Sequence, residues 1–267
     1  MIGQETIDSA IKWCDIGQRW IENSAVKLGL EYLDRAISVF NEGGERAWLT
    51  YAQHRKMEGL RLARREEEAI ALFEVVMAGY ERMGDGYGKA LLLAHLGESY
   101  ASQGRAERAL AALNLAASVA GAAGLEKVLA HILGLQGELY LQRENLLQAI
   151  RLFRKAEALT EQEGYDKPSL ALRFRAAAAM VRLGERADAT ALLEDQQTRL
   201  VRGLFFREAM EPLTLLSRLY EESGAWDEKN RITQLIHLCG QKLTATDGEP
   251  RKRNEALPEI LPFRPSA

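Results

Sequence analysis

Apolar residues recur along most of the chain three or four positions apart, the spacing that lines one face of an α-helix. One segment of this kind carries them at Leu92, Leu93, Leu96 and Tyr100. After the turn SQGRAE, a second segment carries small and apolar residues at Ala109, Leu113 and Ala116. Glycine-rich joints such as RMGDGYG follow, and glycine readily adopts the positive φ that ends a helix. The pattern predicts two antiparallel helices joined by a short turn, and then another such pair.

The same pattern returns every 40 residues. Gly97 and Tyr100 recur as Gly137 and Tyr140. The glycines that close each unit keep the same step: Gly44, Gly84, Gly124 and Gly164. Six units stay in phase without an insertion or a deletion, which indicates an array of stacked helix pairs.

The glycine inside the first helix of a unit has a packing explanation. Gly17, Gly97 and Gly137 share one position of the repeat, and Ala109 and Ala149 lie on the helix that would face them. Small side chains on both helices let the two axes approach closely. Close packing then offsets the cost of about 1 kcal/mol that a helical glycine carries relative to alanine. We therefore expect the helices of a pair to cross at these residues.

Two residues depart from the repeat pattern. Lys56 occupies a position that is apolar in the other units. Pro212 falls within the first helix of the last unit. Because proline has no backbone N–H, we expect that helix to begin late, near Glu208, or to be kinked.

These residues resemble the tetratricopeptide repeat, whose pattern is W-x2-L-G-x2-Y in the first helix and A-x3-F, then A, in the second. The matching residues in one unit are Leu96, Gly97, Tyr100, Ala109, Leu113 and Ala116. Those in the next are Gly137, Tyr140, Ala149, Phe153 and Ala156. The 40-residue step is similar to the long-helix variety of kinesin light chains and MalT-type bacterial regulators. The resemblance implies an all-α fold, an α-solenoid that forms a right-handed superhelix of six antiparallel helix pairs over residues 1–243.

Residues 244–267 differ in composition from the array. They hold four of the six prolines and show no helical period, which predicts a disordered, proline-rich tail. Within it, Leu257–Pro265 places apolar side chains between prolines. Three interpretations stay open: a segment that docks in the groove of the same chain, a docking peptide for a second protein, or an unused tail.

Composition narrows the functional classes. The net charge of -3 argues against a general nucleic-acid binder, which would be basic. No apolar run approaches the roughly 18 residues of a membrane span, and the N-terminus lacks the pattern of a signal peptide. The two cysteines, Cys14 and Cys239, are expected to be free thiols in a reducing compartment, so we expect a cytoplasmic protein. Arginine outnumbers lysine, which is consistent with a bacterial source.

The sequence contains no recognisable catalytic or metal-binding motif. The four histidines, His54, His95, His131 and His237, show none of the usual metal-ligand spacings. Gly84–Gly88 is rich in glycine, but it lies between two predicted helices and is interpreted as a linker. We therefore expect no catalytic residues, no metal and no cofactor, and the protein is not expected to be an enzyme.

The candidate site is the surface formed by the first helix of each unit. The resemblance to tetratricopeptide repeats implies that these helices line a concave face. Glu58, Glu98 and Glu138 share one position of that helix, and Arg218 occupies it in the last unit. The residues expected to flank this acidic stripe are Tyr51, His54, Arg61, His131, Phe174, Arg175 and Arg182. Aromatic residues beside charges are typical of interfaces, although a merely solvated helix face would look similar.

Two functions stay open at this point. The first is a non-enzymatic scaffold or adaptor that binds a protein or peptide in its concave groove. The second is a regulatory receptor whose groove senses a small peptide or metabolite, as in MalT-type arrays.

Overall fold

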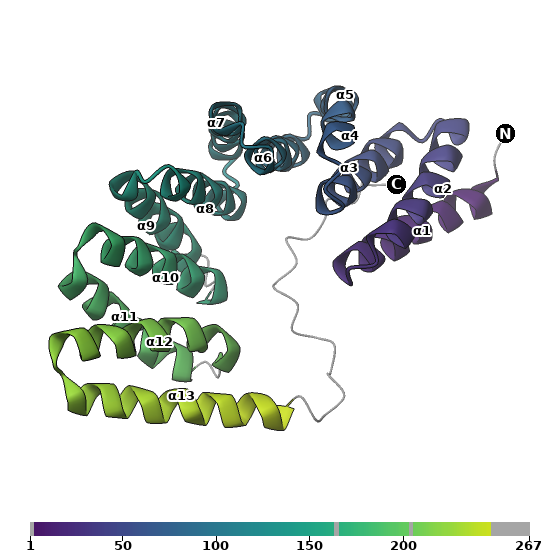
Figure 1. The fold of residues 1–267 in the computed structure, drawn as a ribbon. Coiled ribbons are helices and arrows are strands. Elements are labelled where there is room, and N and C mark those ends of the chain that lie inside the picture. Colours follow the sequence, from purple (N-terminus) through teal and green to yellow (C-terminus); the bar gives the residue numbers. More distant parts are fainter. Residues whose placement is uncertain (1–2, 163–165, 203–204, 247–267) are drawn as a thin grey trace. The chain divides into compact units, whose positions relative to one another are not determined.

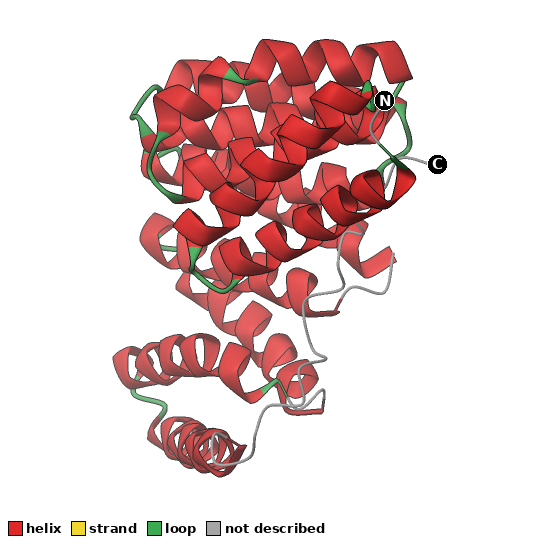
Figure 2. Ribbon diagram, turned by 90° about the vertical axis from the view of Figure 1, so that its right-hand side faces the viewer, coloured by secondary structure: helices red, strands yellow, loops and turns green. Residues whose placement is uncertain are grey.

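A computed structural model describes residues 3–162, 166–202 and 205–246. Throughout these residues every regular element is an α-helix (Figure 1 and Figure 2), which confirms the all-α prediction. None of the described helices is long and apolar enough to cross a membrane. The helices belong to two compact units, one that extends to Val128 and one that starts at Leu129.

The N-terminal unit contains the first three helix pairs. Its helices are α1 (Gln4–Glu22), α2 (Val26–Gly43), α3 (Arg46–Leu62), α4 (Glu66–Ala71), α5 (Phe73–Met83), α6 (Gly86–Ser102) and α7 (Ala106–Ala122). Helix α1 packs on α2, α3 packs on α4 and α5, and α6 packs on α7. The second helix of pair two is interrupted at Leu72, which divides it into α4 and α5. The repeat pattern did not predict this break.

The C-terminal unit contains the remaining pairs, with the division falling inside the first turn of α8. Its helices are α8 (Glu126–Gln142), α9 (Leu146–Gln162), α10 (Asp166–Leu183), α11 (Arg186–Arg202), α12 (Phe206–Ser223) and α13 (Trp226–Thr246). Buried Leu133 on α8, Phe153 on α9 and Ala176 on α10 belong to one apolar cluster. The expected tail overlaps the end of α13, and Leu257–Pro265 lies outside the described residues.

The turn between the two helices of a pair has the same backbone conformation in every pair, although its sequence varies. Directly after the first helix, every pair has one residue in the left-handed region: Ser24, Arg64, Gly104, Glu144, Gly184 and Gly224. Ser24, Arg64 and Glu144 have φ values of 66°, 60° and 58° although they carry side chains. This conformation costs a residue other than glycine roughly 1–2 kcal/mol, so the packing of the helices holds the turn where the local sequence does not favour it.

The two helices of a pair cross where the small residues predict. A Cβ added to Gly97 would lie 2.7 Å from Leu113 Cγ, and one added to Gly137 would lie 2.6 Å from Phe153 Cε1. Ala109, on the facing helix, has no exposed surface. At these distances a side chain on either glycine would overlap a buried neighbour, so the glycines set the spacing of the helices.

The structure accommodates the departures from the repeat in different ways. Lys56 points its ammonium group at Asp34, with 2.6 Å between Nζ and Oδ1. Helix α12 begins at Phe206, so Pro212 lies inside it and the expected start near Glu208 is wrong. Gly84–Gly88 is only partly a linker, because α6 begins at Gly86. Asp85 caps that helix by accepting a hydrogen bond from the backbone N–H of Gly88 at 2.9 Å.

Candidate interaction surface

The predicted site residues divide between the two compact units, and each set is described by itself. Tyr51, His54, Glu58 and Arg61 lie on α3, and Glu98 lies on α6, all in the N-terminal unit. The C-terminal unit holds the rest on α8, α10 and α12: His131, Glu138, Phe174, Arg175, Arg182 and Arg218.

Two of the predicted surface residues are buried. His54 is 0% exposed and Tyr51 is 3% exposed. The Tyr51 hydroxyl donates a hydrogen bond to Gln18 Oε1 at 3.2 Å, and its ring packs edge-on against Trp48. Because neither side chain has a surface that a partner could touch, we leave both out of the proposed interface.

His54 instead joins three helices through a buried polar network. Its Nδ1 lies 2.7 Å from the Tyr80 hydroxyl on α5, and its Nε2 lies 3.0 Å from His95 Nδ1 on α6. Burial lowers the pKa of His54 well below its ordinary value, and the neighbouring His95 and Arg55 lower it further. Because one ring nitrogen of neutral His54 can donate while the other accepts, a single proton on this ring serves both contacts, and His54 is a neutral structural residue at pH 7.

The glutamates of the N-terminal unit are paired with arginines. Arg55 Nη1 lies 2.8 Å from Glu58 Oε2, and Arg61 Nη2 lies 3.3 Å from Glu98 Oε2. Burial alone would raise the pKa of Glu58, but Arg55, His95 and Arg61 together lower it. Burial raises the pKa of Glu98, which Arg61 offsets only in part. The expected acidic stripe is therefore, in this unit, a row of alternating charges.

Arg55 is a member of this surface that the sequence analysis missed. Its side chain is 11% exposed, and its guanidinium lies over the Tyr51 ring, 5.4 Å from the ring centroid. Its Nε is buried and has no hydrogen-bond partner within residues 3–162, 166–202 and 205–246. The spacing of three residues between Arg55 and Glu58 on one helix was a signal for the pair.

The C-terminal unit repeats the pairing of charges along its first helices. Arg175 Nη1 lies 3.1 Å from Glu138 Oε1, which joins α10 to α8. Arg182 Nη2 lies 2.5 Å from Glu144 Oε1. His131 and Arg218 are exposed, whereas Phe174 is partly buried against the apolar core. A pair that joins two first helices thus occurs in both units, Arg61 with Glu98 and Arg175 with Glu138, whereas Glu144 lies in the turn after α8.

A metal site and a reactive thiol each require a particular arrangement among the described residues. The described residues contain no group of three or more His, Cys, Asp or Glu that could hold a metal ion. Cys14 and Cys239 are buried free thiols. Burial, with a contribution from Asp15, raises the pKa of Cys14 to about 12, which keeps this thiol protonated and a poor nucleophile at neutral pH. Fixed pairs of carboxylates and guanidinium groups present both acceptors and donors to a polypeptide.

Comparison with known proteins gives a consistent answer for the fold. No protein-family model and no curated protein sequence matches the chain. Among solved structures, BtubC (BKLC) from P. vanneervenii is similar with a TM-score of 0.68 and 13% identity, over 90% of this chain and 96% of that one.

Two further solved structures are similar over most of this chain. The STAND protein PH0952 from Pyrococcus horikoshii, which has a tetratricopeptide repeat sensor, matches with a TM-score of 0.73 and 12% identity, over 91% of this chain and 38% of that one. A Rap protein complexed with Competence and Sporulation Factor matches with a TM-score of 0.63 and 11% identity, over 91% and 67%. At these identities the likeness concerns the fold alone.

Proposed function

Since this chain has the fold of tetratricopeptide-type helical repeat proteins, we propose that it is a non-enzymatic scaffold or adaptor that binds a protein or peptide segment along the first helices of its pairs. The surface consists of Arg55, Glu58, Arg61 and Glu98 in the N-terminal unit. In the C-terminal unit it consists of His131, Glu138, Phe174, Arg175, Arg182 and Arg218.

The observation that carries the proposal is the recurrence of arginine–glutamate pairs on this face. The Arg175–Glu138 pair, whose side chains are 47% and 34% exposed, stabilises the fold by only about 0–1 kcal/mol, so stability alone gives little reason for this pair. Pairs that are already fixed lose little side-chain entropy when a partner binds. Their exposed oxygens and N–H groups match the alternating donors and acceptors of a peptide backbone.

The kind of partner allows a second candidate function. A regulatory receptor for a small peptide is the second candidate, and the similar Rap structure with its bound factor supports it. In either case we propose a cytoplasmic protein, in line with its two free cysteines, and a bacterial source, in line with the excess of arginine over lysine. The net charge of -3 makes a nucleic-acid partner the weaker choice.

Affinity capture followed by mass spectrometry tests this function. The triple variant Glu58→Gln, Glu98→Gln, Glu138→Gln removes three charges without changing side-chain size, and it should lose the partner that the wild type captures. The matched control Glu31→Gln, Glu74→Gln, Glu126→Gln changes three exposed glutamates on other faces and should retain it. Equal capture by both variants would place the interface elsewhere.

A further inference from the structure

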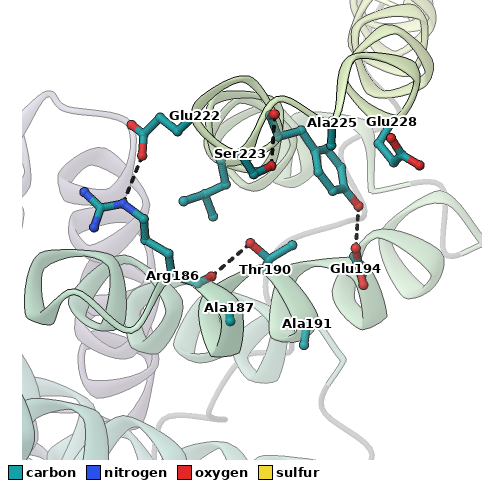
Figure 3. Close-up of a pocket in the computed structure, with 11 residues that line it drawn as sticks. Arg186, Ala187, Thr190, Ala191, Glu194, Glu222, Ser223, Ala225 and Glu228 are labelled. Atoms are coloured by element: carbon teal, nitrogen blue, oxygen red, sulfur yellow. Dashed lines mark hydrogen bonds and ion pairs between the residues drawn. The ribbon is translucent and has the colours of Figure 1, made fainter.

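A second feature of the C-terminal unit lies away from the first-helix surface. A cavity of about 880 Å³ opens between the first half of α11, the end of α12 and the start of α13. Figure 3 shows Ala187 and Ala191 on one wall, Arg186 and Glu222 at one end, and Glu194 and Glu228 toward the other. Leu219 and Tyr220 complete the lining. Its volume is in the range of ligand-binding pockets.

The cavity exists because this pair carries small residues where the preceding pair carries large ones. Forty residues earlier in the repeat, the positions of Ala187, Thr190 and Ala191 hold Leu147, Ile150 and Arg151. The small residues at Ala187 and Ala191 are exposed at the surface of α11. Stacking of the helix pairs does not require small residues here, because the equivalent positions 40 residues earlier carry large side chains.

Two lining residues of the cavity also carry the opposite charge to the residues 40 positions earlier in the repeat. Glu194 and Glu222 occupy the repeat positions of Arg154 and Arg182. With Glu228 they give the cavity three carboxylates, against the single lining cation of Arg186. Glu228 Oε1 also lies 3.3 Å from Arg231 Nη2, which leaves Glu194 as the carboxylate that has no ion pair among the described residues. The lining is therefore acidic, and an acidic cavity favours a cationic ligand.

The carboxylates differ in how they are held. Arg186 Nε lies 3.0 Å from Glu222 Oε2, so this pair closes one end of the cavity with little net charge. Glu194 forms no ion pair with any described residue, but it accepts a hydrogen bond from the Tyr220 hydroxyl at 2.5 Å. Tyr220 is 9% exposed, and its hydroxyl thus orients a carboxylate that has no cationic partner among the residues that the structure describes.

We propose that this cavity binds a basic segment of a partner polypeptide, with an arginine or lysine side chain between Glu194 and Glu228. The cation compensates the charge of Glu194, and its aliphatic stem lies against Ala187, Ala191 and Leu219. A cavity of this size exceeds one side chain, so the neighbouring residues of the segment enter with it. None of the first-helix residues of the proposed function takes part, and either site can fail alone.

Fluorescence anisotropy with defined peptides tests the proposal on the full chain. The probe is a labelled Gly-Arg-Ala-Arg-Gly peptide, and the comparison peptide carries glutamine in place of each arginine. The wild type should bind the arginine peptide at least tenfold more tightly than the glutamine peptide. Its affinity should fall as the salt concentration rises.

Two variants test the open volume of the cavity and its negative charge independently. Ala187→Leu with Thr190→Ile rebuilds the surface of the preceding pair and should weaken binding of the arginine peptide at least tenfold. Glu194→Gln with Glu228→Gln should do the same while leaving the cavity open. Circular dichroism should show wild-type helicity for both, and Glu31→Gln on α2 is the control.

Three results would each overturn the proposal. The first is no binding of the arginine peptide to the wild type at millimolar concentration. The second is equal binding of the two peptides. The third is undiminished binding to the variant with the filled cavity.

Discussion

Acidification should destabilise the N-terminal unit through the buried ring of His54. At pH 7.5 this histidine is neutral in the folded and in the unfolded chain, because its ordinary pKa is about 6.5. Its pKa in the folded chain is well below that value. As the pH falls through 6.5, the unfolded chain therefore takes up a proton at His54 while the folded chain does not.

The sign and size of the effect follow from this difference in proton binding. Neutral His54 contributes stability above pH 6.5, and that contribution is lost as the pH falls toward the lowered pKa of the folded state. From pH 7.5 to pH 5.5 the free energy of unfolding should fall by about 1.4 kcal/mol for this one residue. Glu98 acts in the opposite direction, because its pKa is raised and the folded state takes up its proton more readily.

Urea denaturation followed by circular dichroism at several pH values measures the loss. His54→Leu removes the titrating group, so its stability should change less across this window than that of the wild type, by about 1.4 kcal/mol. The variant should also be less stable at every pH, because the buried Tyr80 hydroxyl loses a partner. The change with pH is therefore the diagnostic quantity.

His237→Gln, an exposed histidine outside the network, is the control and should keep the wild-type change. The comparison at each pH isolates His54 from the glutamates, which are common to all three proteins. An equal change of stability with pH in the wild type and in His54→Leu would refute the reasoning.

Two further predictions concern the packing of each unit, and urea or thermal denaturation measures both. Gly97→Leu should destabilise the protein by about 3 kcal/mol through overpacking, whereas Gly86→Ala, whose new Cβ meets only an ordinary contact at 3.4 Å, should change stability by at most about 0.5 kcal/mol. A larger effect at Gly86 would mean that the helix crossing is assigned to the wrong residues. Arg173→Met should cost about 3–5 kcal/mol, because it leaves the buried Glu157 carboxylate without its partner at 2.6 Å. Arg199→Met, at a 48% exposed position, should cost less than about 1 kcal/mol, and similar losses in the two variants would contradict this account.

The interaction surface shows where sequence reasoning stops. Glu58, Glu98 and Glu138 share one repeat position, which the sequence displays directly. Arg55 and Arg175 share another repeat position, but the pairing does not follow it: Arg55 pairs with Glu58 on its own helix, whereas Arg175 pairs with Glu138 on a neighbouring helix. Arg61, at a different repeat position, pairs with Glu98 across helices. Whether a glutamate on this face is neutralised therefore depends on which arginine side chains can reach it in the folded protein. The sequence alone suggested an acidic stripe.

The helix pairs, their 40-residue step and their crossing points could all be predicted from the sequence. Each depends on residues close together in the chain, such as Gly97 and Leu113 of one pair, and the same pattern recurs in the next unit. Tertiary structure decided which residues of the first helix reach the surface. Cys14, His54 and Ala94 share one repeat position and are all buried. At the same position, Phe174 is partly buried and Thr214 is exposed. The burial of such a residue depends on how closely the neighbouring pair packs against it, and side chains about 40 residues away determine that packing.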